Sequence, residues 1–309
     1  MERIILIETS TALCSVALAE DGAIVDYRES SAPKAHASLT AVFIQDMLTE
    51  RGLSPADCDA VCVSMGPGSY TGLRVGVSTA KGICFGARKP LIAVGTLDTL
   101  VAQAVDVIAR SEATNVIARS EATWQSPQYI IPMVDARRME VYTAVFGIAG
   151  QQGEIATDST NPRNDKQDGN DGQQGEIATD SANPRNDKQD TPDVIARSEA
   201  TNVIARSEAT WQSPRYIQLT ETAPMIIDEN SFAEYLEQGP CLFIGDGAGK
   251  CADVIRHPNA SFCQCNPKAS SMLSPALAAY KEKRFEDVAY FEPFYLKEFV
   301  ATVSKKKLF

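Results

Sequence analysis

The chain has 309 residues, of which 44% are hydrophobic, and its net charge is −11. This composition supports a globular core, and the length is sufficient for two domains of ordinary size. The acidic charge argues against a lone nucleic-acid-binding protein, because it repels phosphate backbones. Any role at RNA would therefore require a basic partner.

No segment predicts export or membrane insertion. The N-terminus enters a predicted strand at once, without a charged leader or a cleavage site. No apolar run reaches the roughly 20 residues that cross a membrane. The eight cysteines form no C-x-x-C pair and no paired zinc spacing. We therefore expect a cytoplasmic protein in a reducing compartment, without membrane contact.

The first hundred residues predict a three-stranded meander followed by alternating helices and strands. The second strand ends in an Asp-Gly hairpin signal, and Gly52 is expected to end the first helix at its C′ position. The expected strands are 3–7, 14–19, 24–28, 61–65 and 91–94, and the expected helices are 36–51, 71–85 and one from Leu97 onward, capped by Thr96.

The second part of the chain starts again with strands. We expect strands at 129–134, 140–146 and 241–244, a helix at 232–238 capped by Ser231, and a helix at 275–284. Each part is thus a meander, a crossover, a helix and a strand. This order predicts an α/β fold of two related lobes, each a mixed sheet with helices.

Near-identical repeats interrupt this order. Residues 106–127 recur without change at 193–214, and residues 150–168 recur at 172–190 with one difference. The second pair is too polar to bury a core, so we expect surface insertions that are mostly disordered or loosely helical. The predicted domains are an N-terminal lobe at 1–105, an insertion at 106–127, a C-terminal lobe at 128–149 and 216–309, and an insertion at 150–215.

The most informative stretch is GPGSYTGLR, from Gly66 to Arg74, between a predicted strand and a predicted helix. Gly66 and Gly68 permit backbone angles that a side chain forbids, and Ser69 or Thr71 can cap the helix. Such a turn can bind an anion. However, the lysine of a P-loop and the third glycine of the dinucleotide pattern are absent. A rigid strand-to-helix connection is the favoured interpretation, with phosphate binding as the alternative.

The helix at 71–85 carries small residues at four-residue spacing: Gly72, Gly76 and Ala80. Small residues on one face let another helix approach closely. A partner interface and ordinary internal packing both remain open as explanations.

Several short runs together indicate a family. They are IETS at 7–10, MGPGSYTGLRVG at 65–76, AKG at 80–82, PMVDARRMEVY at 132–142, GDGA at 245–248 and PFYL at 293–296. With them the chain resembles the TsaB (YeaZ) family, whose members belong to the actin, sugar-kinase and heat-shock ATPase (ASKHA) superfamily. The resemblance covers essentially all of the chain outside the insertions and implies two ASKHA-type lobes. One departure is Lys297, where the family usually carries Arg.

The resemblance implies a non-catalytic scaffold subunit of the bacterial complex that forms N6-threonylcarbamoyladenosine at position 37 of tRNAs reading ANN codons. Such a subunit binds and activates a TsaD-type catalytic subunit, and a TsaE-type ATPase joins them. Contact with tRNA would be indirect, and whether the chain forms a homodimer when alone is left open. No catalytic residue, cofactor or metal site is expected, since His36 and His257 are the only histidines and no H-x-x-x-H pair exists.

The partner interface is expected on the helices at 36–51 and 71–85. Replacing Gly76 by a bulky residue is expected to weaken the pair while leaving the isolated fold intact. The expected interface residues are Leu39, Phe43, Met47, Gly72, Leu73, Gly76, Val77, Ala80 and Ile83.

Two alternatives remain: a weak nucleotide-binding or ATPase protein, and a metal-independent peptidase-like enzyme. For the peptidase, Ser69 has no adjacent histidine, and Ser38 and His36 would not face each other on a helix. For the nucleotide site, acidic residues at turns could bind Mg²⁺ through water or act as solvated or capping carboxylates. The residues of such a vestigial site would be Glu8, Thr9, Ser10, Gly66, Gly68, Asp135, Asp246 and Gly247.

Overall fold

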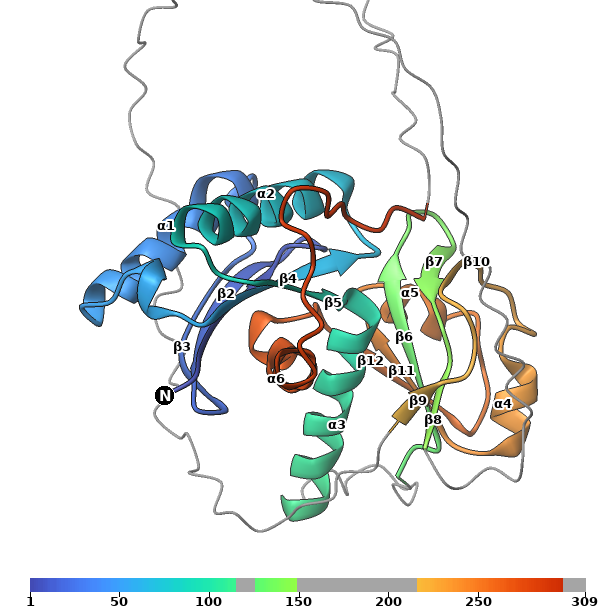
Figure 1. Cartoon of the computed structure of the whole chain (residues 1–309). Helices are drawn as coiled ribbons and strands as arrows, with labels where there is room; N and C mark the ends of the chain where they lie inside the picture. Colours follow the sequence, from blue (N-terminus) through green and yellow to red (C-terminus); the bar gives the residue numbers. More distant parts are fainter. Residues whose placement is uncertain (115–125, 149–215, 297–309) are drawn as a thin grey trace, which may run out of the picture.

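Two mixed β-sheets, each covered by helices, form the body of the protein (Figure 1). The computed structural model describes residues 1–114, 126–148 and 216–296. The insertion expected at 150–215 lies outside the described residues, as do residues 115–125 of the other expected insertion.

The first sheet contains β1 (Arg3–Glu8), β2 (Cys14–Glu20), β3 (Ala23–Ser30), β4 (Ala60–Gly66) and β5 (Leu91–Gly95). Its strand order is β3-β2-β1-β4-β5. The first three strands pair antiparallel, and Asp21 and Gly22, both with positive φ, form the tight turn between β2 and β3. Strands β4 and β5 extend the sheet in parallel, which requires the helical crossovers predicted from the sequence.

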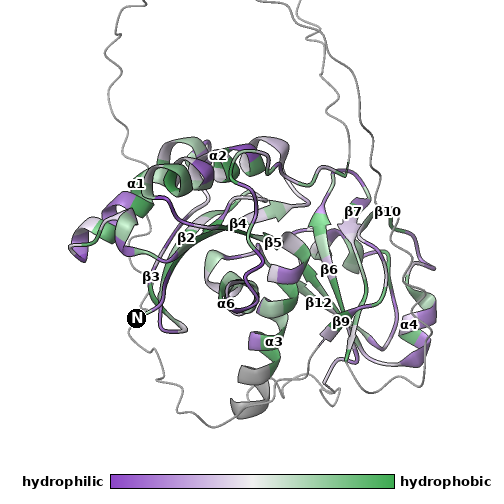
Figure 2. Cartoon of the chain, viewed as in Figure 1, coloured by the Kyte–Doolittle hydropathy of each residue, from purple (hydrophilic) through white to green (hydrophobic). Residues whose placement is uncertain are grey.

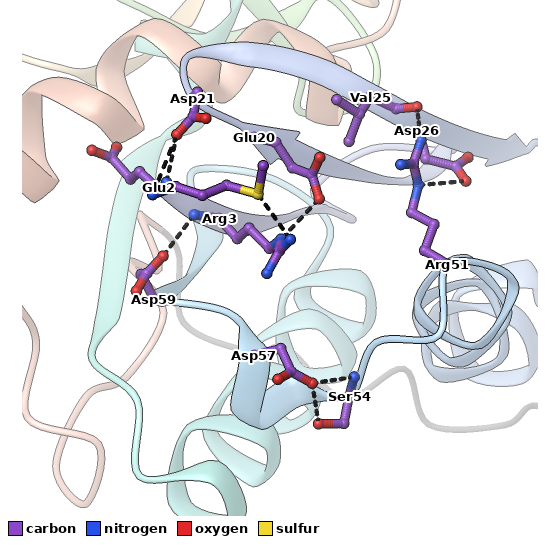
Figure 3. Close-up of polar contacts among 11 residues, drawn as sticks. Glu2, Arg3, Glu20, Asp21, Val25, Asp26, Arg51, Ser54, Asp57 and Asp59 are labelled. Atoms are coloured by element: carbon purple, nitrogen blue, oxygen red, sulfur yellow. Dashed lines mark hydrogen bonds and ion pairs between the residues drawn. The ribbon is translucent and has the colours of Figure 1, made fainter.

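Polar contacts hold the N-terminal end of β1 in place (Figure 3). The Arg3 backbone N–H donates to Asp59 Oδ2 at 2.7 Å, and Arg3 Nε donates to Glu20 Oε1 at 2.8 Å. These contacts join β1 to β2 and to the segment that enters β4. The opposite end of β1 carries Glu8, so the same strand positions the candidate site described below.

Helices α1 (Ala35–Glu50) and α2 (Tyr70–Ala87) cover one face of the first sheet. Their buried side chains recur at helical spacing and form one core with β1, β2 and β4. Gly52 follows α1 with a φ of 65° and donates its N–H to Thr49 O at 3.0 Å, as its predicted C′ position requires.

The second sheet repeats the topology of the first. In the described residues it contains β6 (Tyr129–Asp135), β7 (Glu140–Thr143), β8 (Phe146–Ile148), β9 (Tyr216–Gln218), β10 (Ala223–Ile226), β11 (Cys241–Gly245) and β12 (Ala260–Gln264). Five of these strands follow the order β10-β7-β6-β11-β12, while β8 pairs with β6 and β9 pairs with β8. Numbered one to five along the chain, these five strands have the same order, 3-2-1-4-5, as the strands of the first sheet. The predicted α/β fold of two related lobes is confirmed.

Hydrophobic residues concentrate on the central strands of both sheets, including β4 and β6 (Figure 2). Both strands are buried along nearly their whole length. This matches the nearly unbroken apolar runs that are typical of strands covered on both faces.

Two helices connect the lobes. Helix α3 (Thr96–Thr114) follows β5 but packs Leu97, Leu100 and Ile108 against the second sheet. The 3₁₀ helix η2 (Ala269–Met272) and helix α6 (Leu273–Lys281) follow β12 but pack against the first sheet. The start of α3, which was assigned to the N-terminal lobe, thus packs on the second sheet, and η2 and α6, which were assigned to the C-terminal lobe, pack on the first. Helix α3 also continues across the expected boundary at residue 106.

The short elements of the second lobe include α4 (Ala233–Gln238) and α5 (Ala248–Ala252), and η1 (Pro55–Asp57) precedes β4 in the first lobe. Ser231 was expected to cap α4, and this was wrong. Its hydroxyl instead donates to Asp228 Oδ1 at 2.9 Å, and Phe232 takes the N-cap position without a side-chain cap. Strands β9, β10 and β12 and helix α5 were not predicted.

The last described segment returns to the first lobe, and we call residues 286–295 the strap. The Glu286 N–H donates to Leu91 O at 2.8 Å, and the Phe294 N–H donates to Met65 O at 2.7 Å. Between them, Phe291 is buried against the core beneath α2. Figure 1 shows the strap running from α6 past β5 to α2. None of the helices in the part of the chain described here is long and apolar enough to cross a bilayer.

Candidate functional site

The turn after β1 lies directly beneath the N-terminus of α2. A Cβ added at Gly68 would overlap the carbonyl oxygen of Ser10, and one at Gly72 would overlap that of Thr9. A Cβ at Gly76 would overlap Thr9 Oγ1. The small residues of α2 therefore serve internal packing, the second explanation offered by the sequence. They let the helix rest on the turn.

Two N–H groups at the start of α2 are used within the chain. The Ser69 N–H donates to Ser10 O at 2.6 Å, and the Ser69 side chain caps the helix by accepting from Gly72 N at 3.3 Å. Gly66 has a φ of 109° and lies against the strap, where an added Cβ would be 2.7 Å from Phe294 O. The glycine-rich run thus has the geometry of a rigid strand-to-helix connection, the favoured interpretation.

Glu8 lies at the end of β1 and is fully buried, as is Thr9, while Ser10 is 1% exposed. The Ser10 N–H donates to Glu8 Oε1 at 2.7 Å. Burial raises the pKa of Glu8, and hydrogen bonds from Ser10 and Ser64 oppose this shift only in part. This first-lobe group therefore does not present an exposed carboxylate to a hydrated metal ion.

The second-lobe group lies at the ends of β6 and β11. The Asp135 N–H donates to Asp246 Oδ1 at 2.9 Å, and Lys250 forms an ion pair with Asp135. Lys250 also donates to Glu140 O at 2.7 Å. The structure therefore brings Asp135 and Asp246 together, but a lysine from α5 neutralises the more exposed carboxylate. Burial raises the pKa of Asp246.

Gly247 completes the second-lobe group. Its N–H donates to Met133 O at 3.0 Å, and an added Cβ would lie 2.9 Å from Val141 Cγ1. The glycine therefore allows close packing of the β11–α5 turn on β6 and β7, much as Gly72 does for α2 in the first lobe.

A cavity of about 220 Å³ lies where the lobes meet. It is smaller than the ~300–1,000 Å³ typical of ligand sites and is mainly apolar. Of the expected nucleotide-site residues only Gly66 lines it. The other lining residues come from β4 and the turn after it, the end of β5, α3, β8, β9 with the loop after it, and the strap. They are Met65, Pro67, Gly95, Leu97, Asp98, Phe146, Gln218, Thr222 and Phe294.

The expected interface residues lie mostly in the core. Leu39 and Ile83 are half-buried against that core, and Gly72 and Gly76 rest on the turn after β1. The buried side chains of this set face the core, whereas Leu39 and Ile83 keep part of their surface exposed. The fully or nearly fully buried side chains among them are Phe43, Met47, Leu73, Val77 and Ala80.

The exposed apolar residues of the two helices lie on their outer face. Phe85 is 81% exposed and Val42 is 43% exposed. A Cβ added at Gly82 or Gly86 would meet no atom within 4 Å, so the backbone of α2 is open to solvent there. We call Ala41, Val42, Gly82, Phe85 and Gly86 the outer face. Phe85 breaks the inward spacing of Leu73, Val77, Ala80 and Cys84, and this was the sequence signal that could have identified it.

The residues considered for peptidase chemistry do not meet. His36 Nε2 lies 2.9 Å from Thr11 O, while the Ser38 hydroxyl donates to Lys34 O at 3.2 Å. His257 Nδ1 accepts from the Asn259 N–H at 3.2 Å. Within residues 1–114, 126–148 and 216–296, no three His, Cys, Asp or Glu side chains are grouped to hold a metal ion.

The comparisons with known proteins agree on one group of relatives. The family model described as "TsaD: tRNA N6-adenosine threonylcarbamoyltransferase" matches residues 29–303. The "tRNA threonylcarbamoyladenosine biosynthesis protein TsaB" of Escherichia coli (strain K12) is 37% identical over 146 residues, which are 47% of this chain and 54% of that protein. The protein of the same name from Bacillus subtilis (strain 168) is 28% identical over 143 residues, 46% of this chain and 54% of that protein. The chain thus spans about half the length of the curated relatives it matches.

Among solved structures, "YeaZ from Pseudomonas aeruginosa" has the same fold. Its TM-score is 0.62 at 19% identity, and the match covers 96% of this chain and 100% of that chain. The family model, the curated relatives and the shared fold lead to one conclusion. The chain belongs to the TsaB (YeaZ) family, within the wider Gcp-like group that the threonylcarbamoyltransferase model describes.

Proposed function

We propose that this chain is a non-catalytic subunit in the formation of N6-threonylcarbamoyladenosine on tRNA. Its work is to dock onto a TsaD-type catalytic subunit and activate it, with a TsaE-type ATPase joining the complex. Support comes from the names of the TsaB relatives and from the family model, which is described by that tRNA modification. The net charge of −11 supports an indirect contact with tRNA, through the partner.

The observation that carries this proposal is the outer face of α1 and α2. An exposed hydrophobic residue is common on monomeric proteins, and by itself it needs no explanation. Here Phe85 lies in sequence between Gly82 and Gly86, which are about one turn of α2 apart. Neither glycine carries a side chain that would block an approaching helix. Fully burying a Phe side chain contributes about 1.5–3 kcal/mol. A neighbouring helix could therefore pack closely on this face, with Phe85 as its anchor.

The arrangement beneath α2 supports a non-catalytic role. The Ser69 N–H, which an anion would need, is bound to Ser10 O, and Glu8 is buried beside it. In the second lobe Lys250 neutralises Asp135. Ser10 in the first group and Asp135 in the second thus bond within their own lobes, which supports a role of the fold as a rigid support for the outer face.

Substitution of Phe85 tests the docking surface. The full chain and its Phe85→Asp variant are each mixed with the TsaD-type subunit of the same organism and passed over a size-exclusion column. We expect the variant to lose most of the complex while its melting temperature stays unchanged, because Phe85 is 81% exposed. Ile226→Asp is the matched control, since Ile226 is 74% exposed but lies on β10 of the second lobe.

Equal complex formation by Phe85→Asp and the unchanged chain would rule out the outer face. Loss of the complex with Ile226→Asp alone would place the interface on the second lobe. The same variants report on self-association, since a homodimer formed through the outer face would become a monomer with Phe85→Asp. The proposed activity itself is tested by reconstituting tRNA modification with and without this chain.

A further inference from the structure

Charge is distributed unevenly along the chain. The whole chain has a net charge of −11 and 40 aspartates and glutamates, yet residues 60–97 contain neither of them. The same segment carries four basic residues, which are Arg74, Lys81, Arg88 and Lys89. All four lie in α2 or directly after its end at Ala87. The helix that carries Phe85 is therefore basic, although the protein as a whole is acidic.

Three of these charges belong to the side of α2 that carries Phe85. Arg74, Ser78, Lys81 and Phe85 follow one another at separations of four, three and four residues, which is the spacing of one helix face. Arg74 therefore lies about 16 Å from Phe85 along the helix axis, and Lys81 lies about 6 Å from it. Arg88 follows Phe85 by three residues and is the exposed C-cap of the helix. We call Arg74, Lys81 and Arg88 the basic stripe, because they flank Phe85 on both sides.

The basic stripe has no carboxylate partner within the described part of the chain. Arg74 is exposed, its Nη1 donates to Tyr70 Oη at 2.9 Å, and its guanidinium lies 5.3 Å from the centroid of the Tyr70 ring. Lys81 donates to two carbonyl oxygens of the strap. The first-lobe arginines that do form ion pairs with carboxylates are Arg3, Arg28 and Arg51. Unlike them, Arg74 and Arg88 are available to the carboxylates of another protein.

We propose that the surface of the catalytic subunit that docks on α2 is acidic, with carboxylates that pair with Arg74 and Arg88 around an apolar contact at Phe85. The inference rests on the proposed function and adds the chemistry of the partner surface. Exposed ion pairs contribute little to affinity, because water screens them. They attract the partner from a distance and align it, and so they act mainly on the association rate. The basic stripe thus governs how fast the complex forms, and Phe85 governs how long it lasts.

An acidic protein surface fits this helix better than RNA or a second copy of the chain. RNA carries negative charge along its whole length, so the net charge of −11 opposes its approach. A protein partner needs carboxylates only where it meets α2. The open backbone at Gly82 and Gly86 also suits close packing of a helix. A second copy that packed α2 against α2 would bring two basic stripes together, and these would repel each other.

The rate of association tests the proposal. The full chain and an Arg74→Gln/Arg88→Gln variant are each mixed with the TsaD-type subunit of the same organism, and association and dissociation are followed at about 0.01 M and about 0.15 M salt. We expect the variant to associate about fivefold more slowly at the lower salt concentration and to dissociate at nearly the unchanged rate. The difference should shrink at the higher concentration, where the Debye length falls from about 30 Å to about 8 Å. An Arg74→Glu/Arg88→Glu variant should associate more slowly still.

The matched control is Arg137→Gln/Arg138→Gln, which removes two exposed positive charges from the turn between β6 and β7 of the second lobe. This control should associate at the rate of the unchanged chain. Equal slowing by the control would mean that only net charge matters, and it would overturn the proposal. So would faster association of the glutamate variant, since that result requires a basic partner surface.

The Phe85→Asp variant separates this inference from the proposed docking surface. If Phe85→Asp abolishes the complex while the glutamine variant of the basic stripe behaves as the unchanged chain does, the acidic partner surface is wrong and the docking surface stands. If Phe85→Asp forms the complex normally, the docking surface is wrong and this inference falls with it. A glutamine variant that docks normally but loses retention of tRNA, or loses self-association, would assign the basic stripe to RNA or to a second copy. Either result would overturn the proposal.

Discussion

Gly76 packs so closely on Thr9 that a Cβ at this position would overlap Thr9 Oγ1. Six residues further along the same helix, a Cβ at Gly82 would meet no atom within 4 Å. The two glycines of α2 therefore have opposite roles. One allows the helix to rest on the turn after β1, and the other leaves the outer face open.

This contrast predicts opposite effects of alanine at the two sites. Gly76→Ala gains about 1 kcal/mol of helix propensity, but it overpacks a fully buried turn, which typically costs about 1–3 kcal/mol. The difference is a net loss of stability of up to about 2 kcal/mol. Gly82→Ala meets no obstacle and should gain up to about 1 kcal/mol. Urea unfolding followed by circular dichroism measures both, and a Gly76→Ala protein stabilised as much as the Gly82→Ala protein would contradict the packing described here.

The same packing argues against the expectation that a bulky residue at Gly76 would weaken docking and spare the fold. Such a side chain would push α2 away from the turn that carries Thr9. Loss of the complex with a bulky residue at Gly76 would therefore indicate damage to the fold and would not identify the docking surface. Gly82 is the better probe, because a large residue there changes the outer face alone.

The burial of Glu8 predicts a pH dependence of stability. Burial raises its pKa in the folded chain above the value of about 4.3 in the unfolded chain. The folded state then holds the proton more tightly, so this contribution to stability is fully present below the unfolded pKa. It is lost as the pH rises through the folded pKa. Glu8→Gln should therefore raise the melting temperature more at pH 8 than at pH 4.

Thermal unfolding at several pH values measures this effect. Glu237→Gln is the control, because Glu237 is exposed at the end of α4. It should shift the melting temperature little and by similar amounts across the range. A Glu8→Gln curve parallel to that of the unchanged chain would show that Glu8 titrates alike in the folded and unfolded states.

The strap predicts a role for Lys81. Its Nζ donates to Ala289 O and to Phe291 O, both at 3.0 Å, and so ties the strap to the flank of α2. Lys81→Met removes both bonds and should destabilise the protein by about 1–2 kcal/mol. Hydrogen exchange at residues 286–295 should become faster, while β1 and β4 stay protected. Lys281→Met, at the exposed end of α6, is the control and should leave exchange in the strap unchanged.

Local sequence patterns predicted the order of the helices and strands, because apolar runs, helix caps and turn residues determine the backbone conformation near them. The apolar run of β4, the capping Ser69 and the C′ Gly52 each act over a few residues. Packing across the chain leaves no such signal. The apolar stripe of α3 shows that one face is buried, but not that the second sheet covers it. Short exposed strands such as β10 lack the alternation that would reveal them.

For the candidate site, too, the sequence predicted the local pattern of apolar residues but not what that pattern packs against. Periodicity identified Leu39, Phe43 and Met47 as one face of the first helix, and the sequence interpretation assigned these residues to a partner interface. In the fold the same periodicity describes the core, because the sheet is the nearer apolar surface. The exposed apolar residues of these helices include ones that break the pattern, as Phe85 does. The three glycines over Thr9 and Ser10 could be assigned to internal packing only once the turn beneath them was visible.

The closed turn beneath α2 predicts the outcome of a nucleotide titration. The Ser69 N–H, which would bind a phosphate oxygen, already donates to Ser10 O at 2.6 Å. In the second lobe Lys250 forms an ion pair with Asp135. Calorimetric titration of the isolated chain with ATP and Mg²⁺ should therefore give no binding heat at micromolar protein. A saturable signal that disappears in an Asp246→Asn variant would instead place a nucleotide at the ends of β6 and β11. Because Asp246 lies far from the outer face in sequence and belongs to the other lobe, that variant should leave docking through Phe85 unchanged. The two functions can therefore be tested independently in the same protein.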